Sequence, residues 1–317
     1  MSINTPKQKN PPQMPVNMIP AGATGEPMNW RAFLQMLVVL FKMRVVSLLL
    51  LAAVGGAFLG AQGWPGLGRL LLILVTGGMA ASGAAALNQY IERHADVAMS
   101  RTRQRPLVTG MIPRPGIVIP IGIALILIPS LAVLPFNPAL SFFLVFGAVI
   151  YVGIYTLWLK PRTLLNIVIG GAAGSAAVMS GGAAVQAWRD PAVIILALLV
   201  FLWTPSHFWS LAILYREDYR KAGVPMLPAH TSLSAAAWWV FLHTVAVGVA
   251  TVGLMATPAL GWVYAVPAGY VTFDLFRRNI QLIRQPDAAH ARSFFIMSNI
   301  YLMVVLVAVC VGASLPW

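Results

Sequence analysis

Oxygen-bearing and positively charged side chains gather in one short polar stretch that starts at Asn88. Glu92 and Asp96 follow Asn88 at intervals of four residues, and Arg101 and Arg105 come next. On a helix these three oxygen-bearing side chains fan over about 80° of one face, because each residue turns by about 100°. Carboxylates beside arginines can hold a divalent metal and the phosphates it carries. The alternative is a solvated basic loop. Two of only 8 Asp and Glu residues lie here, which favours a metal–phosphate site.

A second polar stretch, residues 215–228, carries Glu217 and Asp218 about 120 residues further along the chain. Adjacent residues of a helix point about 100° apart, so at most one of these carboxylates is expected to face the same cavity as Asp96. Mg²⁺ is usually held by one or two carboxylates together with phosphate oxygens. We therefore expect the two stretches to form the two halves of one Mg²⁺–phosphate site.

The elements that position these residues are membrane helices. The chain is 59% hydrophobic and 9% charged, with a mean hydropathy of +0.80, whereas soluble domains are typically about 25% charged. About 20 apolar residues cross the hydrocarbon of a bilayer, and the backbone groups of such long runs can be satisfied there only as helices. Nine helices are expected near residues 33–58, 68–91, 116–134, 139–159, 163–184, 191–214, 235–256, 259–276 and 294–314.

The distribution of positive charge sets the orientation. With the nine helices in place, 19 of the 21 Lys and Arg residues fall on one set of helix ends, and only Arg69 and Arg189 on the other. The positive-inside rule then places the amino terminus and both acidic stretches in the cytoplasm and the carboxyl terminus outside. The net charge of +13 thus reflects topology, and we expect no nucleic-acid partner.

The chain divides into a tail and a membrane domain. Residues 1–29 are polar and Pro-rich, which is typical of a disordered tail and unlike a cleaved signal peptide. Residues 30–317 are expected to form a single transmembrane domain. The lone Cys310 excludes an intramolecular disulfide and is expected to pack in the last helix.

Further polar residues lie within the apolar runs. His207 sits inside the sixth expected helix, where a polar side chain is a functional candidate, although a histidine hydrogen-bonded to a neighbouring helix explains it equally well. Lys42 and Arg44 lie in the first expected helix near its cytoplasmic end, where they could bind anionic groups or extend to the interface. Asn166 could line the same cavity.

Several of these stretches together carry a family resemblance. The pattern N-x₃-E-x₃-D-x₄-R-T-x₂-R-P from Asn88 resembles the first aspartate-rich motif of the UbiA superfamily of intramembrane prenyltransferases. The matches of its protohaem IX farnesyltransferase branch are Phe41-Lys-Met-Arg-Val-Val-Ser47, Arg101-Thr-Arg-Gln-Arg-Pro-Leu107, Thr204-Pro-Ser-His-Phe-Trp-Ser-Leu-Ala212 and Asp218-Tyr-Arg-Lys-Ala-Gly-Val-Pro-Met-Leu-Pro228. The resemblance covers roughly residues 31–314.

Two positions depart from the superfamily pattern. Glu92 stands where an aspartate is usual, so the carboxylate keeps its charge but reaches about one carbon further. Ala222 stands where many superfamily members carry a second aspartate, four residues after Asp218. The haem-specific branch resembles this chain in having the single aspartate. The second departure therefore weakens the resemblance to the superfamily more than the resemblance to that branch.

The resemblance implies an all-α fold of nine helices around a central cavity, in a bacterial inner membrane. It implies the transfer of a farnesyl group from farnesyl diphosphate to a vinyl group of protohaem, giving haem O. Haem A synthase or terminal-oxidase assembly factors are the implied partners. We assign Mg²⁺ binding to Asn88, Glu92, Asp96 and Asp218. Diphosphate binding is assigned to Arg101, Arg105, Lys42 and Arg44, and haem or substrate binding to His207, Asn166, Tyr215 and Lys221.

Two other functions compete with this one. A prenyltransferase with a quinone or another aromatic acceptor would share the acidic stretches, but the haem-specific matches argue against it. A secondary transporter would also carry charges in its membrane helices. Its site would more often lie near the bilayer midplane, whereas the acidic residues here cluster at one face. Transport without consumption of farnesyl diphosphate would distinguish it.

Overall fold

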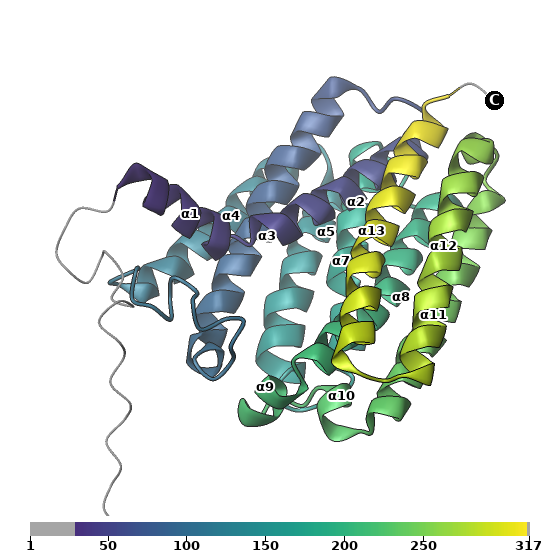
Figure 1. The fold of residues 1–317 in the computed structure, drawn as a ribbon. Coiled ribbons are helices and arrows are strands. Elements are labelled where there is room, and N and C mark those ends of the chain that lie inside the picture. Colours follow the sequence, from purple (N-terminus) through teal and green to yellow (C-terminus); the bar gives the residue numbers. More distant parts are fainter. Residues whose placement is uncertain (1–28, 316–317) are drawn as a thin grey trace, which may run out of the picture.

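The computed structural model describes residues 29–315, and every regular element in that range is helical (Figure 1). The predicted disordered tail, residues 1–29, lies outside the described range except for Asn29. The longer helices are α1 (Trp30–Leu40), α2 (Met43–Ala61), α3 (Leu67–Asp96), α4 (Val118–Val133), α5 (Pro138–Ala148), α7 (Ala172–Ala184), α8 (Pro191–Leu214), α11 (Leu233–Met255), α12 (Gly261–Arg284) and α13 (Ala288–Ala313). The shorter ones are η3 (Pro115–Ile117), the π-helix η4 (Val149–Leu159), α6 (Asn166–Gly170), α9 (Arg216–Lys221), α10 (Leu227–His230) and η5 (Pro258–Leu260).

Eight helical segments within residues 29–315 are long and apolar enough to cross a membrane. They match eight of the nine expected helices, at residues 43–61, 67–96, 115–133, 138–159, 166–184, 191–214, 233–255 and 288–313. The remaining one corresponds to α12, a 24-residue helix that packs beside α11 and α13 but carries Asp274, Arg277 and Arg278. The count of nine and the orientation of the termini therefore stay predictions.

The first expected helix, near residues 33–58, is wrong as a continuous element. It divides into α1 and α2 at Lys42, whose backbone is left-handed at φ 49° and ψ 47°. No Pro or Gly marks this break, so local sequence signals do not predict it. As a result α1 projects from the bundle (Figure 1), and Lys42 stands at a corner of the chain instead of inside a helix.

Helix ends follow from local chemistry elsewhere. Pro138 and Pro191 occupy the first positions of α5 and α8, where the missing N–H costs nothing. The side chains of Asn137 and Asp190, one residue earlier, accept hydrogen bonds from Leu140 N at 3.0 Å and Ala192 N at 2.8 Å. Proline therefore marks the start of both helices.

Glycines let the membrane helices approach closely. A Cβ at Gly181 of α7 would lie 1.8 Å from the Ala53 carbonyl oxygen of α2, and one at Gly83 of α3 would lie 2.5 Å from the Gly122 oxygen of α4. At both contacts the missing side chain lets the helix backbones pack closely.

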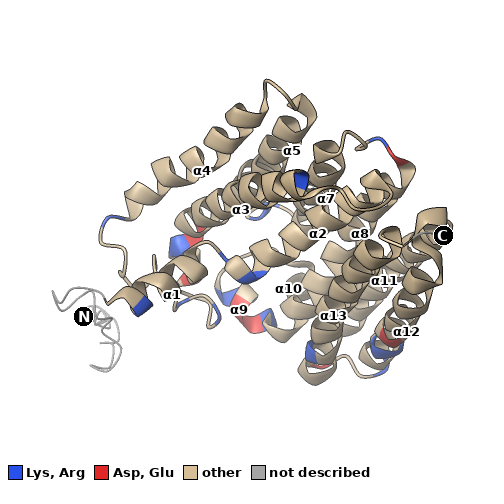
Figure 2. Ribbon diagram, turned by 90° about the horizontal axis from the view of Figure 1, so that it is seen from above, with Lys and Arg blue, Asp and Glu red and all other residues tan. Residues whose placement is uncertain are grey.

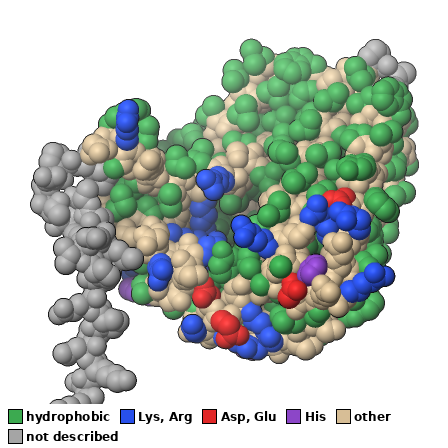
Figure 3. Space-filling view, viewed as in Figure 1, with side chains coloured by type: hydrophobic (Ala, Val, Ile, Leu, Met, Phe, Trp, Pro, Cys, Tyr) green, Lys and Arg blue, Asp and Glu red, His purple; other side chains and the backbone are tan. Residues whose placement is uncertain are grey.

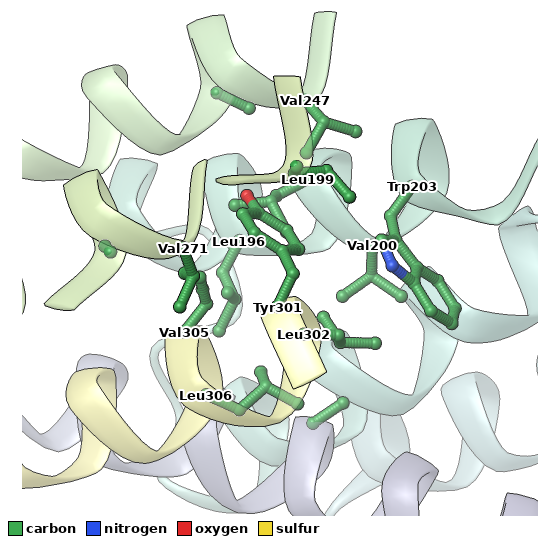
Figure 4. Packing of buried hydrophobic residues seen from close by; sticks show 14 of the residues in the cluster. Leu196, Leu199, Val200, Trp203, Val247, Val271, Tyr301, Leu302, Val305 and Leu306 are labelled. Atoms are coloured by element: carbon green, nitrogen blue, oxygen red, sulfur yellow. The ribbon is translucent and has the colours of Figure 1, made fainter. Parts of the chain in front are cut away.

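The largest apolar core lies among α2, α8, α11, α12 and α13. In Figure 4 the side chains of Leu196, Val200 and Trp203 from α8 face Tyr301 and Val305 from α13. The charged residues lie elsewhere: Figure 2 shows most of them around α1, the end of α3 and α9 and at the ends of α12 and α13, with a few more near α7 and in the loop before α8. The apolar packing thus holds α8 and α13 beside the polar region described next.

Candidate active site

The last turns of α3 present the first polar stretch as one face. Asn88 Nδ2 donates to Glu92 Oε1 at 2.8 Å. The Arg105 guanidinium lies 2.5 Å from Asp96 Oδ2 and 3.7 Å from Glu92 Oε2. One arginine thus contacts both carboxylates, which confirms that the three oxygen-bearing side chains share a side of the helix. Asp96 is buried and Glu92 largely so.

Two lysines complete this network. Lys42 Nζ donates to Asn88 Oδ1 and, at 3.0 Å, to the Tyr151 hydroxyl. Lys160 Nζ lies 2.5 Å from Glu92 Oε1. Burial and the nearby positive charge of Arg105 lower the pKa of Lys42 to about 7. Burial also disfavours the charged form of Lys160. The attraction of the Glu92 carboxylate is stronger than this effect of burial, so the pKa of Lys160 lies above its usual value.

The π-helix η4 forms the wall opposite α3. Its hydrogen bonds run over five residues, as from Lys160 N to the Tyr155 carbonyl at 2.8 Å, so residues four or five apart lie on one side. Tyr151 and Tyr155 stack with ring centroids 5.9 Å apart, and Thr156 Oγ1 accepts from Asn88 Nδ2 at 2.9 Å. The wide helical turns therefore bring Tyr151, Thr156 and Lys160 to the same site, and π-helical segments often occur at functional sites.

The second polar stretch meets the first through one carboxylate. Asp218 Oδ2 accepts hydrogen bonds from the backbone N–H of Ser100 at 2.9 Å and from its hydroxyl at 2.5 Å. Glu217 points away, is 68% exposed and pairs with Arg220 at 2.9 Å. Only one of the adjacent carboxylates thus faces the first stretch, as the 100° offset predicts. A cavity of about 420 Å³ beside Asp218 is lined by Ser100, Tyr215 and Glu217 among others.

The residues fit a metal ion bound together with an anion better than a metal ion alone. Within residues 29–315, no three His, Cys, Asp or Glu side chains lie close enough to hold a metal by themselves. Glu92, Asp96 and Asp218 each engage a cation or a hydroxyl instead. A metal with a diphosphate could exchange these partners, with the carboxylates turning to the metal and the lysines and arginine to the phosphates. The predicted metal cluster stays a prediction.

The remaining candidates for diphosphate binding differ in position. Lys42 and Arg105 lie in the network, whereas Arg44 is exposed, with no polar partner for its side chain among the described residues. Arg101 is exposed, but its charge acts on Lys42. Figure 3 shows a hollow in the molecular surface with Lys and Arg side chains deep inside it. An anion entering this hollow would meet several positive charges.

His207 lies between two aromatic rings. Its ring stacks on Trp203 of α8, with centroids 4.2 Å apart, and on Phe295 of α13, with centroids 4.6 Å apart. Its Nδ1 is 2.8 Å from Ser298 Oγ, and that hydroxyl donates to the Phe295 carbonyl at 2.8 Å. Because the hydroxyl has one hydrogen, Nδ1 must donate to it, and Nε2 is left with a lone pair.

The other candidates for haem or substrate binding lie near the second stretch. Asn166 is fully buried, and its Nδ2 donates to the carbonyls of Thr163 at 2.6 Å and Pro225 at 2.8 Å. It therefore ties α6 to the segment after Asp218 and has no exposed surface. Tyr215 is half-buried beside the 420 Å³ cavity, and Lys221 is exposed.

Some residues of this site were not singled out from the sequence. Sequence patterns indicate a topological role for Lys160 and no role for Tyr151, Thr156 or Ser100. The spacing from Tyr151 through Thr156 to Lys160 is five and then four residues, which places them on one side only when the helix is wide. Ser100 follows Asp96 by four residues, and this spacing could have indicated it.

Comparisons with known proteins agree on one family. A family model described as the UbiA prenyltransferase family matches residues 48–305. The chain is 38% identical over 276 residues to a protein of Metallosphaera sedula named protoheme IX farnesyltransferase, covering 85% of this chain and 93% of that one. It is 39% identical over 277 residues to a Gloeobacter violaceus protein of the same name, covering 85% and 88%.

Solved structures share the fold. A structure described as digeranylgeranylglyceryl phosphate synthase superposes with a TM-score of 0.74 at 17% identity, covering 89% of this chain and 98% of that one. A UbiA homologue from Aeropyrum pernix superposes with a TM-score of 0.66 at 18% identity, covering 85% and 96%. A UbiA homologue from Archaeoglobus fulgidus bound to DMAPP and Mg²⁺ superposes with a TM-score of 0.57 at 14% identity, covering 87% and 99%.

Proposed function

The chain belongs to the UbiA prenyltransferase family and is a membrane prenyltransferase; from this premise we propose that it transfers a farnesyl group from farnesyl diphosphate to a vinyl group of protohaem IX. The C–O bond to diphosphate breaks and a C–C bond to the vinyl group forms. Water then adds its hydroxyl to the adjacent carbon and releases a proton, which gives haem O. The observation that carries this choice of acceptor is the 38–39% identity, over most of the chain, to proteins named protoheme IX farnesyltransferase.

The polar network supports the diphosphate half of the proposal. Lys42, Arg105 and Lys160 surround Glu92 and Asp96 within a few ångströms, so positive and negative partners for a metal–diphosphate pair are already assembled. Mg²⁺, when bound, would neutralise charge on the leaving diphosphate. Asn88, Glu92, Asp96 and Asp218 would hold it. The three cations, together with Arg101, would bind the phosphate oxygens and stabilise the charge that develops as the C–O bond breaks.

His207 supports the haem half. Imidazole is a common axial ligand of haem iron and binds through an unprotonated nitrogen. The hydrogen bond to Ser298 leaves Nε2 in that form, and no polar partner of Nε2 is recorded within residues 29–315. Trp203 and Phe295 fix the ring orientation from both sides. We assign His207 as a haem ligand and Ser298 as the residue that sets its tautomer.

A single incubation tests the proposal. Purified protein with protohaem, farnesyl diphosphate and Mg²⁺ should yield a product whose mass is that of haem plus a farnesyl group and a hydroxyl group. Asp96→Asn protein, treated identically, should yield none. Farnesyl transfer to an added quinone precursor but not to haem would support the alternative acceptor. Solute movement in vesicles without consumption of farnesyl diphosphate would support a transporter and contradict the proposal.

A further inference from the structure

Gln89 is a buried amide on α3, next to Asn88 but outside the network described above. It is 1% exposed, and its Nε2 donates to the carbonyl oxygens of Val39 at 2.6 Å and Leu40 at 3.0 Å. Its Oε1 is buried without a partner among the described residues. A flipped amide would press that oxygen against two carbonyl oxygens, so the orientation is unambiguous and Gln89 acts only as a donor.

The two carbonyls that Gln89 binds belong to the last turn of α1. The final carbonyls of a helix lack partners within it, and here they are capped by a side chain from another helix. Few other interactions hold α1, because Trp30, Phe33 and Val38 are exposed. Only Met36 and Leu40 of α1 are buried, and Leu40 packs into a small cluster that includes Ala86 of α3.

Lys42 follows this turn after one residue. A left-handed backbone such as that of Lys42 is costly for a residue with a side chain and persists only where the surroundings hold it. The Lys42 N–H donates to the Val39 carbonyl at 3.2 Å, the same oxygen that Gln89 binds. At the other end, Lys42 Nζ donates to Asn88 and Tyr151. Gln89 of α3 therefore binds the turn that precedes Lys42, and its neighbour Asn88 binds the Lys42 ammonium.

We propose that Gln89 is a positioning residue that caps α1, fixes the left-handed corner at Lys42 and thereby aims the Lys42 ammonium at the diphosphate site. The diphosphate role of Lys42 rests on the proposed function, whereas the capping does not. Gln89 itself touches no reacting atom. Its contribution to turnover passes entirely through Lys42, so removing Lys42 should remove the effect of Gln89.

The test compares Gln89→Met, Lys42→Met and the double variant. Methionine has a similar volume to glutamine and no N–H to donate. Hydrogen exchange followed by mass spectrometry on a peptide covering residues 37–46 should be at least about tenfold faster in Gln89→Met, with unchanged exchange in α12. The KM for farnesyl diphosphate should rise about tenfold with a smaller change in kcat, and the double variant should be no worse than Lys42→Met.

A control and a second variant keep the outcome decisive. Asn279→Leu removes an equally buried amide on α12, whose Nδ2 makes one long bond of 3.3 Å to Thr244, and should leave exchange in residues 37–46 unchanged. Gln89→Asn keeps the amide on a side chain one carbon shorter. It should speed hydrogen exchange in residues 37–46 as well, but by less than Gln89→Met does. Unchanged hydrogen exchange in both Gln89 variants would overturn the inference. So would a double variant whose loss of activity equals the product of the losses in Gln89→Met and Lys42→Met. If no acceptor is prenylated, the exchange result still decides whether Gln89 caps α1.

Discussion

Ser100 binds the Asp218 carboxylate with both its backbone N–H and its hydroxyl, at 2.9 and 2.5 Å. This pair joins segments 118 positions apart in the chain. Because Ser100 lies four residues after Asp96, any movement of Asp218 toward a metal ion is coupled to the segment that carries Asp96. The contact explains how two distant polar stretches can act as one site.

Replacement of Asp218 by Asn should abolish farnesyl transfer, by at least about 100-fold, while the protein still inserts into membranes. The amide keeps the size of the side chain but loses the charge that a metal ion requires. Product formation measured by mass spectrometry checks this. Glu217→Gln is the matched control, because Glu217 is adjacent but 68% exposed, and it should keep nearly full activity. Full activity of Asp218→Asn would remove this residue from the metal site.

Replacement of Lys160 by Met should lower both stability and activity. Glu92 is 11% and Lys160 17% exposed, and removal of one partner of a buried ion pair typically costs about 3–5 kcal/mol. Glu92 keeps Asn88 and Arg105, so we expect the lower end, measured by unfolding in detergent. Adding Glu92→Gln should recover stability but not activity. If the double variant is no more stable than Lys160→Met, the pair does not stabilise the fold.

Replacement of His207 by Ala should weaken haem binding about tenfold or more, as followed by the shift of the haem absorption band. Ser298→Ala should produce a smaller loss, because the hydroxyl only fixes the histidine tautomer. His243→Ala serves as a control, since His243 of α11 packs 5.2 Å from Trp209, which lies two residues after His207 and so on another face of α8. Unchanged haem affinity with lost turnover would instead assign His207 a role in the chemistry.

Removal of divalent metal should abolish turnover. It should also abolish the stabilisation of the folded protein by farnesyl diphosphate. Farnesyl diphosphate should raise the melting temperature only with Mg²⁺ present, because the carboxylates otherwise remain paired with Lys160 and Arg105. A thermal scan with and without a chelator measures this. An equal shift in both conditions would show that the diphosphate binds to the cations alone.

Gly181→Ala should destabilise the fold by about 1–3 kcal/mol, since its new Cβ would lie 1.8 Å from the Ala53 oxygen and force α2 and α7 apart. Gly253→Ala is the control, because its Cβ would meet only an Ile195 methyl at an ordinary 3.7 Å. Unfolding in detergent compares the two. Equal stability of both variants would contradict the close contact.

The features that could be predicted from the sequence are those that follow a regular spacing and those that depend on one residue type, such as proline at a helix start. The spacing of Asn88, Glu92 and Asp96 follows the α-helical period, so their shared face could be read directly. Pro138 and Pro191 begin helices because proline is tolerated there and disfavoured further inside. Hydropathy located eight of the nine expected spans, since lipid requires long apolar runs.

What could not be predicted depends on contacts between distant segments. The break at Lys42 carries no Pro or Gly, and contacts from Asn88, Gln89 and Tyr151 hold it in place. The tie from Asn166 to the Pro225 carbonyl spans 59 residues and has no local signature. These features arise only when the helices pack.

The π-helix also has a consequence for how the protein tolerates insertions and deletions. Losing one residue within 149–159 would let the segment return to ordinary α-helical bonding at little cost to its passage through the membrane. Every side chain beyond the deletion would then turn by about 100°, and Lys160 would leave Glu92. We expect a protein shortened in this way to insert and fold but to lack the contact between Lys160 and Glu92.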